Sequence, residues 1–163
     1  KDEKDRMLAQ LYAPGDERPF FQHELFHVYH AQFFEACDEV WCALWREGLA
    51  VYVSEQLNPG ATDAQMGLVM PRPIRPEVDA NLAAAVCAVR ARLGSDDRAD
   101  YGPLFLGQAS LEGLPPRVGY YVGYLVAREA GRTRSLQELA HMRAREARGV
   151  VEAALGNLAS CDN

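Results

Sequence analysis

The sequence predicts a mainly α-helical bundle with little or no β-structure, and three observations lead to that prediction. Apolar residues recur at helical spacing along most of the chain. Clusters of Pro and Gly interrupt the chain where these segments are expected to begin and end. Runs that alternate convincingly between apolar and polar residues are absent, so strands are at most minor. The 163 residues have the length of one domain, and we treat residues 1–163 as a single helical unit.

Three helices are expected in the first third of the chain. A short one over residues 2–12 ends at the Pro-Gly-Asp turn at 14–16. The next, over residues 19–36, carries aromatic and aliphatic residues over a wide arc, and we expect it to be mostly buried. A third begins at a cap formed by Asp38 and ends near Leu57. Its expected inner side carries Trp41, Leu44, Trp45, Leu49 and Tyr52.

The middle of the chain is expected to be irregular and then helical. Residues 58–76 are rich in proline and are predicted to form a loop with one helical turn near Ala64. Pro76 suits the first turn of a helix that ends before Gly94. Residues 95–114 are predicted to contain a short helix at most.

Further helices are expected in the last third. The prolines at 115–116 precede a helix over residues 117–130, which Gly131 ends. A capping box at 135–138 begins the next helix. The last helix is amphipathic and is expected to run over residues 146–158.

Composition and charge restrict the class of protein. Hydrophobic residues make up 48% of the chain and charged residues 25%, which excludes a disordered or low-complexity protein. The longest apolar runs fall far short of the ~20 residues that span a bilayer. The net charge of −6 argues against nucleic acid and against an anionic membrane surface, because both attract basic faces. We therefore expect no nucleic-acid partner and no membrane span.

The four cysteines leave two interpretations open. None forms a CxxC pair, so a zinc ribbon or a thioredoxin-type site is not expected. They could form two disulfides in an exported protein, or remain four buried thiols. Cys37 and Cys42 are too far apart to bridge within one helix, and could pair only across a turn or with Cys87 and Cys161. We favour an exported protein, periplasmic or secreted, over a cytoplasmic one.

The motif with the clearest chemistry is His23-Glu24-x-x-His27. On a helix, side chains four residues apart lie one turn apart on the same face, so both imidazoles can reach one metal ion. Glu24 is rotated by about 100° from His23 and can reach a water on that ion. Zinc lowers the pKa of such a water, and a neighbouring carboxylate can take its proton. The alternative is a cluster that is merely solvated or hydrogen-bonded.

A catalytic zinc site needs a third protein ligand. His30 lies on the same helix face but about 10 Å from His23 along the axis, too far to share one ion. We therefore interpret His30 as an outer or surface residue. Glu47 is the better candidate, because the 20-residue step from His27 leaves room for a turn and an antiparallel return. Gly48 lacks bulk and is expected to let these two helices approach closely. A solvent-facing carboxylate is the alternative for Glu47.

HExxH, nineteen intervening residues and then Glu-Gly-Leu-Ala resemble the gluzincin clan of zinc metallopeptidases, which includes thermolysin-like and aminopeptidase-like enzymes. The resemblance implies that His23, His27 and Glu47 bind Zn²⁺ and that Glu24 is the general base. The Glu-Gly-Leu-Ala form looks most like small bacterial zinc peptidases of unknown function. The fold implied is the helical half of a gluzincin catalytic domain, with the HExxH helix and the Glu47 helix antiparallel.

A second, weaker resemblance lies in Tyr120-Tyr-Val-Gly123. It is similar to a later motif of the clan whose Tyr stabilises the oxyanion, which implies that role for Tyr120. Gly119 and Gly123 are four residues apart and should pack against a neighbouring helix. At least one hydroxyl of Tyr120 and Tyr124 should then face the zinc. The alternative is an ordinary aromatic packing set. We interpret Arg117 as a surface residue, with binding of a substrate carbonyl or carboxylate as the alternative.

Two features depart from the gluzincin pattern. Some members place an acidic residue four positions after the third ligand, where this chain has Val51. The clan's catalytic domains also place a β-sheet before the HExxH helix, and its edge strand holds the peptide. Only 22 residues precede His23, too few for that sheet. Either the chain is the helical half of a larger enzyme, which is the interpretation that we favour, or the sheet of the family is missing.

The predicted function is zinc-dependent hydrolysis of peptide bonds in a peptide or protein substrate. Two other functions stay open. One is a gluzincin-like domain that binds metal without catalysis and serves interaction or structure. The other is a metal-dependent hydrolase that acts on a non-peptide substrate.

Overall fold

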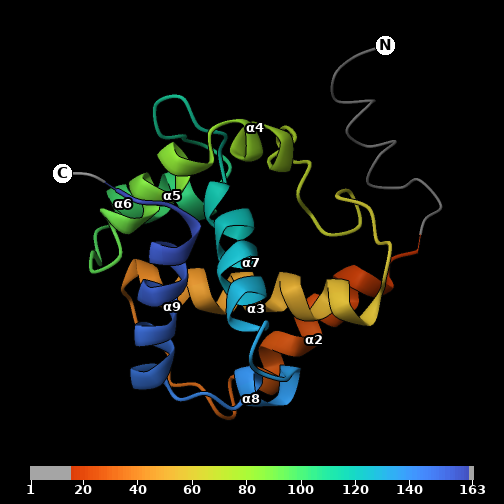
Figure 1. Cartoon of the computed structure of the whole chain (residues 1–163). Helices are drawn as coiled ribbons and strands as arrows, with labels where there is room; N and C mark the ends of the chain where they lie inside the picture. The colour runs from red at the N-terminus through yellow and green to blue at the C-terminus, as the bar shows by residue number, and fades with distance from the viewer. Residues whose placement is uncertain (1–15, 162–163) are drawn as a thin grey trace.

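The computed structural model describes residues 16–161, and in this part of the chain it contains eight helices and no strand (Figure 1). This confirms the predicted mainly α-helical bundle. The helix expected over residues 2–12 lies outside the described residues. The helices are α2 (Arg18–His30), α3 (Val40–Leu57), α4 (Arg75–Ala80), α5 (Leu82–Arg90), α6 (Arg98–Phe105), α7 (Val118–Ala130), α8 (Leu136–Ala140) and α9 (Ala144–Leu158).

Helix α3 runs through the middle of the bundle, and α7 and α9 cross it (Figure 1). Twelve of its 18 residues are buried. The side chains predicted to face inward are all buried, namely Trp41, Leu44, Trp45, Leu49 and Tyr52. Because apolar residues occur around most of its circumference, α3 can be covered by neighbours on several sides at once.

Two glycines set the contact between α3 and α7. A Cβ placed on Gly48 would lie 2.1 Å from the carbonyl carbon of Gly123, and one on Gly123 would lie 2.5 Å from the carbonyl oxygen of Leu44. Gly123 therefore packs against a neighbouring helix as predicted, and Gly119 packs in the same way against Leu104 and Phe105 of α6. The expectation that Gly48 faces the HExxH helix is wrong, because its open side is filled by the backbone of α7.

Helices α2 and α3 are antiparallel, as predicted. Near the start of α2, the carbonyl of Pro19 accepts a hydrogen bond from the hydroxyl of Ser54, near the end of α3 (2.6 Å). After the last turn of α2, Phe34 meets Trp41 at the start of α3, with ring centroids 6.2 Å apart. A disulfide between Cys37 and Cys42 closes the connection across a turn.

The prediction for α2 itself was wrong in two respects. The helix ends at His30 rather than near residue 36, and Phe33 and Phe34 turn back by bonding to the carbonyl of His30. It is also mostly exposed: only Pro19, Phe26 and His30 are buried. Large apolar side chains point outward along it and just beyond its end, namely Phe20, Phe21, Leu25, Val28, Tyr29 and Phe33.

Three other boundaries differ from prediction. Glu39, not Asp38, precedes α3, and its carboxylate accepts a bond from the indole of Trp41 rather than capping the helix (2.8 Å). The helix expected from Pro76 to Gly94 is divided into α4 and α5 at Asn81, whose φ of −136° is not helical. The last helix begins at Ala144 rather than Glu146.

The second half otherwise follows its local signals. The capping box between Ser135 and Glu138 is formed in both directions, and it begins the short helix α8. A second disulfide, Cys87–Cys161, ties the end of the described chain to α5. The interpretation with two disulfides therefore holds, rather than the one with four thiols.

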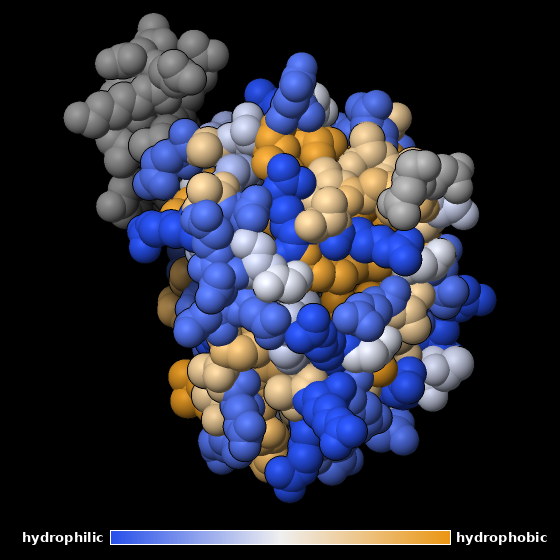
Figure 2. Space-filling model, turned by 90° about the vertical axis from the view of Figure 1, so that its left-hand side faces the viewer, coloured by the Kyte–Doolittle hydropathy of each residue, from blue (hydrophilic) through white to orange (hydrophobic). Residues whose placement is uncertain are grey.

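The surface is largely polar where α6 and α9 face outward. Figure 2 shows this side of the molecule, where hydrophilic residues dominate and apolar residues gather in limited patches. None of the described helices combines the length and the apolar character needed to cross a membrane.

Candidate metal centre

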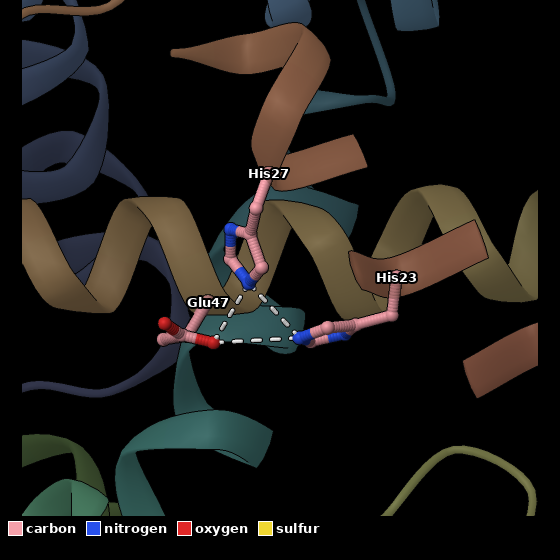
Figure 3. Close-up of side chains that lie close together, drawn as sticks. All are labelled: His23, His27 and Glu47. Atoms are coloured by element: carbon pink, nitrogen blue, oxygen red, sulfur yellow. Dashed lines mark hydrogen bonds and ion pairs between the residues drawn. The ribbon is translucent and has the colours of Figure 1, made fainter. Parts of the chain in front are cut away.

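The three predicted ligands come together. His23 and His27 lie one turn apart on α2, and Glu47 extends toward them from α3 (Figure 3). The two Nε2 atoms are 3.0 Å apart. The Oε2 atom of Glu47 lies 3.2 Å from Nε2 of His27 and 3.4 Å from Nε2 of His23. Among the described residues, this is the one group of three His, Cys, Asp or Glu side chains that could hold a metal ion.

The donor set fits a zinc-sized cation. Zinc bonds of ~2.0–2.1 Å to nitrogen and oxygen, arranged tetrahedrally, place their donor atoms roughly 3.3 Å apart. The three separations in this cluster, 3.0 to 3.4 Å, are close to that value. Two imidazole nitrogens and a carboxylate oxygen leave one tetrahedral position for water or substrate.

Glu47 is charged in this position. Burial by itself raises the pKa of its carboxyl group, but hydrogen bonds from His23 and His27 outweigh that effect and lower the pKa to about 2. About a fifth of its side chain is exposed, as is the case for His27. Glu47 is therefore an ionised, partly sheltered carboxylate, which is the form that binds a metal.

The ligands border a cavity of about 310 Å³, a volume within the range of ligand pockets. Glu24 is exposed but also lines this cavity, beside the two histidines. Tyr120 and Arg117 line it from α7 and from the residue that precedes α7. The structure thus brings the predicted metal ligands, the predicted general base and the predicted oxyanion residue to one cavity.

Tyr120 and Tyr124 have different surroundings although they are one turn apart. Tyr120 is half-buried beside Phe105, and burial raises the pKa of its hydroxyl, with a further contribution from the charge of Glu47. The hydroxyl therefore keeps its proton at neutral pH and can donate a hydrogen bond. Tyr124 is buried against Tyr52 and Tyr121, and does not line the cavity.

His30 is not one of the residues that could hold the ion, and it is buried, so the alternative of a surface residue is wrong. Its side chain is 1% exposed and stacks between the rings of Phe26 and Phe34. Burial lowers the pKa of His30 to about 4, and the positive charges of Arg46 and His27 add to the shift. The imidazole is therefore neutral, and it belongs to the packing between α2 and the turn that follows it.

Around the ligands, the polar contacts that often orient metal-bound histidines are sparse. Such a histidine usually donates its other ring nitrogen to an acceptor. The Nδ1 atom of His27 is buried and has no hydrogen-bond partner within residues 16–161. Val51, at the position where some gluzincins have an acid, is buried in the core.

Sequence reasoning missed several residues around the ligands. Phe20, Met66 and Gly67 line the same cavity, the last two from the loop before α4. Tyr101 of α6 lies near Glu47. Burial raises the pKa of the Tyr101 hydroxyl, and the negative charge of Glu47 raises it further. The positive φ of Gly67 marks a tight turn, but no local pattern indicates that this turn reaches the metal ligands.

Comparison of the chain with protein-family models, with curated proteins and with solved structures finds no match.

Proposed function

We propose that the chain is a zinc-dependent metallopeptidase that hydrolyses peptide bonds in a peptide or protein substrate. The observation that carries the proposal is the convergence of His23, His27 and Glu47 at a cavity that Glu24 and Tyr120 also line. The two disulfides support an exported location, because such bonds persist in oxidising compartments. We also propose, from the sequence resemblance alone, that the chain is related to the gluzincin clan.

His23, His27 and Glu47 would hold the zinc ion, which would supply Lewis-acid chemistry to polarise a carbonyl group and lower the pKa of a water molecule. The carboxylate of Glu24 accepts a proton from the attacking water and then delivers it to the amine that leaves. The hydroxyl of Tyr120 donates a hydrogen bond to the oxygen of the scissile carbonyl as negative charge develops there. His23, His27 and Glu47 hold the ligand geometry during these steps.

Two variants separate metal binding from chemistry. Glu24→Gln should keep a full complement of zinc and lose hydrolysis, because the amide oxygen cannot accept the proton. His23→Ala should lose both. Glu35→Gln is the matched control, since this exposed carboxylate lies after α2 and does not line the cavity. Zinc content is measured by elemental analysis, and hydrolysis by a library of quenched fluorescent peptides.

The result also distinguishes this function from its main rival, a domain that binds metal without catalysis. That rival is favoured by one observation: residues 16–161 contain no strand to hold a peptide by strand addition. Zinc binding with no hydrolysis of any peptide by the wild-type chain would support the rival. Near-normal hydrolysis by Glu24→Gln would show that Glu24 is not the general base.

A further inference from the structure

Arg117 is held in an uncommon conformation at the wall of the cavity. Its φ of 62° and ψ of 22° are left-handed, and no other non-glycine residue within 16–161 has a positive φ. Most side chains avoid this region, and residues kept in it cluster at functional sites. Arg117 occupies the position just before α7, so its side chain emerges three residues before Tyr120.

The guanidinium group is anchored on two sides. Its Nη1 atom donates hydrogen bonds to the carbonyls of Met70 (3.1 Å) and Gly67 (3.3 Å), both in the loop before α4. Its central carbon lies 4.4 Å from the centre of the Tyr120 ring. These contacts use Nη1 and one face of the group, so Nε and Nη2 remain as donors for a ligand.

The positive charge of Arg117 has no carboxylate partner within the described residues. Two arginines of the same region do have one: Arg72 pairs with Glu77 at 2.9 Å, and Arg75 pairs with Asp63 at 2.8 Å. Of the charged groups that line the cavity, Glu24 and Glu47 are acidic, and Arg117 is the basic one. With a divalent ion bound, positive charge is in excess there, which favours an anionic substrate group.

We propose that Arg117 is a specificity-determining residue that binds a carboxylate of the substrate. The group is the C-terminal carboxylate of a peptide or an acidic side chain close to the scissile bond. The planar fork of a guanidinium matches a carboxylate in two parallel hydrogen bonds, and its prior anchoring limits the entropy lost on binding. This inference rests on the proposed peptidase function, since it names the class of peptide that the same cavity accepts.

The test compares three peptides of one apolar sequence. The first ends in a free carboxylate, the second in an amide, and the third in an amide after a C-terminal Glu. We expect the zinc-loaded wild-type chain to show a KM at least about tenfold lower for an acidic peptide than for the neutral amide. A lower KM for the first peptide alone identifies the C-terminal carboxylate as the group that binds. A lower KM for the third peptide identifies an acidic side chain.

Two variants then assign that preference to Arg117. Arg117→Asn tolerates the left-handed conformation and removes the charge, so the ratio of KM values should fall to about one. Arg117→Lys keeps the charge without the fork and should retain part of the preference. Arg132→Gln is the control, because it changes net charge equally on a 73% exposed side chain outside this cavity. Thermal unfolding checks that each variant is folded.

The outcomes separate the two proposals. If the wild-type chain hydrolyses neither these three peptides nor any member of the peptide library, the peptidase function fails, and calorimetry with the same three peptides still measures whether Arg117 selects a carboxylate. The role of Arg117 is overturned if wild type does not distinguish acid from amide. It is equally overturned if Arg117→Asn keeps the wild-type ratio.

Discussion

Helices α2 and α3 both contribute side chains to the candidate metal centre, but they are held in the molecule in opposite ways. Only three residues of α2 are buried, against twelve of α3. The side chain of Leu25 in α2 is 66% exposed, whereas that of Leu44 in α3 is fully buried. Glu47 is thus fixed by a helix that neighbours enclose. The two histidines are fixed by a helix that packs through one side only.

This difference teaches that the ligand geometry depends mainly on α3 and its partner α7. A packed interior transmits small displacements, because its side chains interlock at crystal-like density. Disturbing α3 should therefore shift Glu47 and Tyr120 together. Disturbing the outer side of α2 should leave the ligands in place.

The largest expected effect contrasts two leucines. Leu44→Ala should lower the free energy of unfolding by about 4 kcal/mol, since it leaves a cavity in the core. Leu25→Ala, the matched change on α2, should alter it by less than about 0.5 kcal/mol. Urea denaturation measures both. Similar losses in the two variants would mean that the outer side of α2 is covered in solution.

The next effect tests the close approach of α3 and α7. Gly48→Ala should destabilise the chain by about 3 kcal/mol, because its Cβ would overlap the backbone of Gly123. Gly149→Ala is the control: no atom lies within 4 Å of its added Cβ in α9, so stability should rise by up to about 1 kcal/mol. A silent Gly48→Ala, measured by thermal unfolding, would contradict this packing.

His30, the buried histidine of α2, should make stability depend on pH. Its folded pKa of about 4 lies below the ordinary 6.5, so the unfolded chain binds a proton first as the pH falls. Stability is therefore full above about pH 6.5 and is lost toward pH 4. Between pH 7 and 4.5 this loss should be roughly 2 to 3 kcal/mol greater in wild type than in His30→Phe. Urea unfolding in a chelator excludes metal effects, and equal losses would contradict the assignment.

The smallest effect concerns the connection between the two helices. Replacing Cys37 and Cys42 by Ser removes a bridge between positions five apart, which should cost about 2 kcal/mol. Removing Cys87–Cys161 should cost more, because it closes a loop with a separation of 74. The denaturant midpoints of the two double variants show which disulfide contributes more to stability. A reversed order would indicate that the short bridge holds α2 against α3 in the folded state.

The sequence predicted the features that depend on local spacing. The four-residue step from His23 to His27 places both rings on one face of any helix, and the capping box of Ser135 needs only residues within one turn. The 20-residue step from His27 to Glu47 leaves room for a turn and an antiparallel return, which is the arrangement that the structure has. These local signals do not depend on which distant segments of the chain pack against them.

Features that depend on distant segments were not predictable in this way. The apolar arc of α2 indicates a helix, but the burial of Leu25 depends on which segments cover it. Gly48 indicates a close contact without naming the partner, and α7 is 70 residues further along the chain. The left-handed backbone of Arg117 has no signal in its residue type, because Arg is not a residue that favours it.

The division of the ligands between two helices has a consequence for amide hydrogen exchange. In the metal-free chain, amide protons of α2 should exchange through local opening of that helix, well before those of α3. With an ion shared by His23, His27 and Glu47, α2 must release the ion before it opens. Exchange in α2 should then slow about tenfold for each tenfold rise in free ion above its dissociation constant. The exposed helix would thus report how much ion is available around the protein.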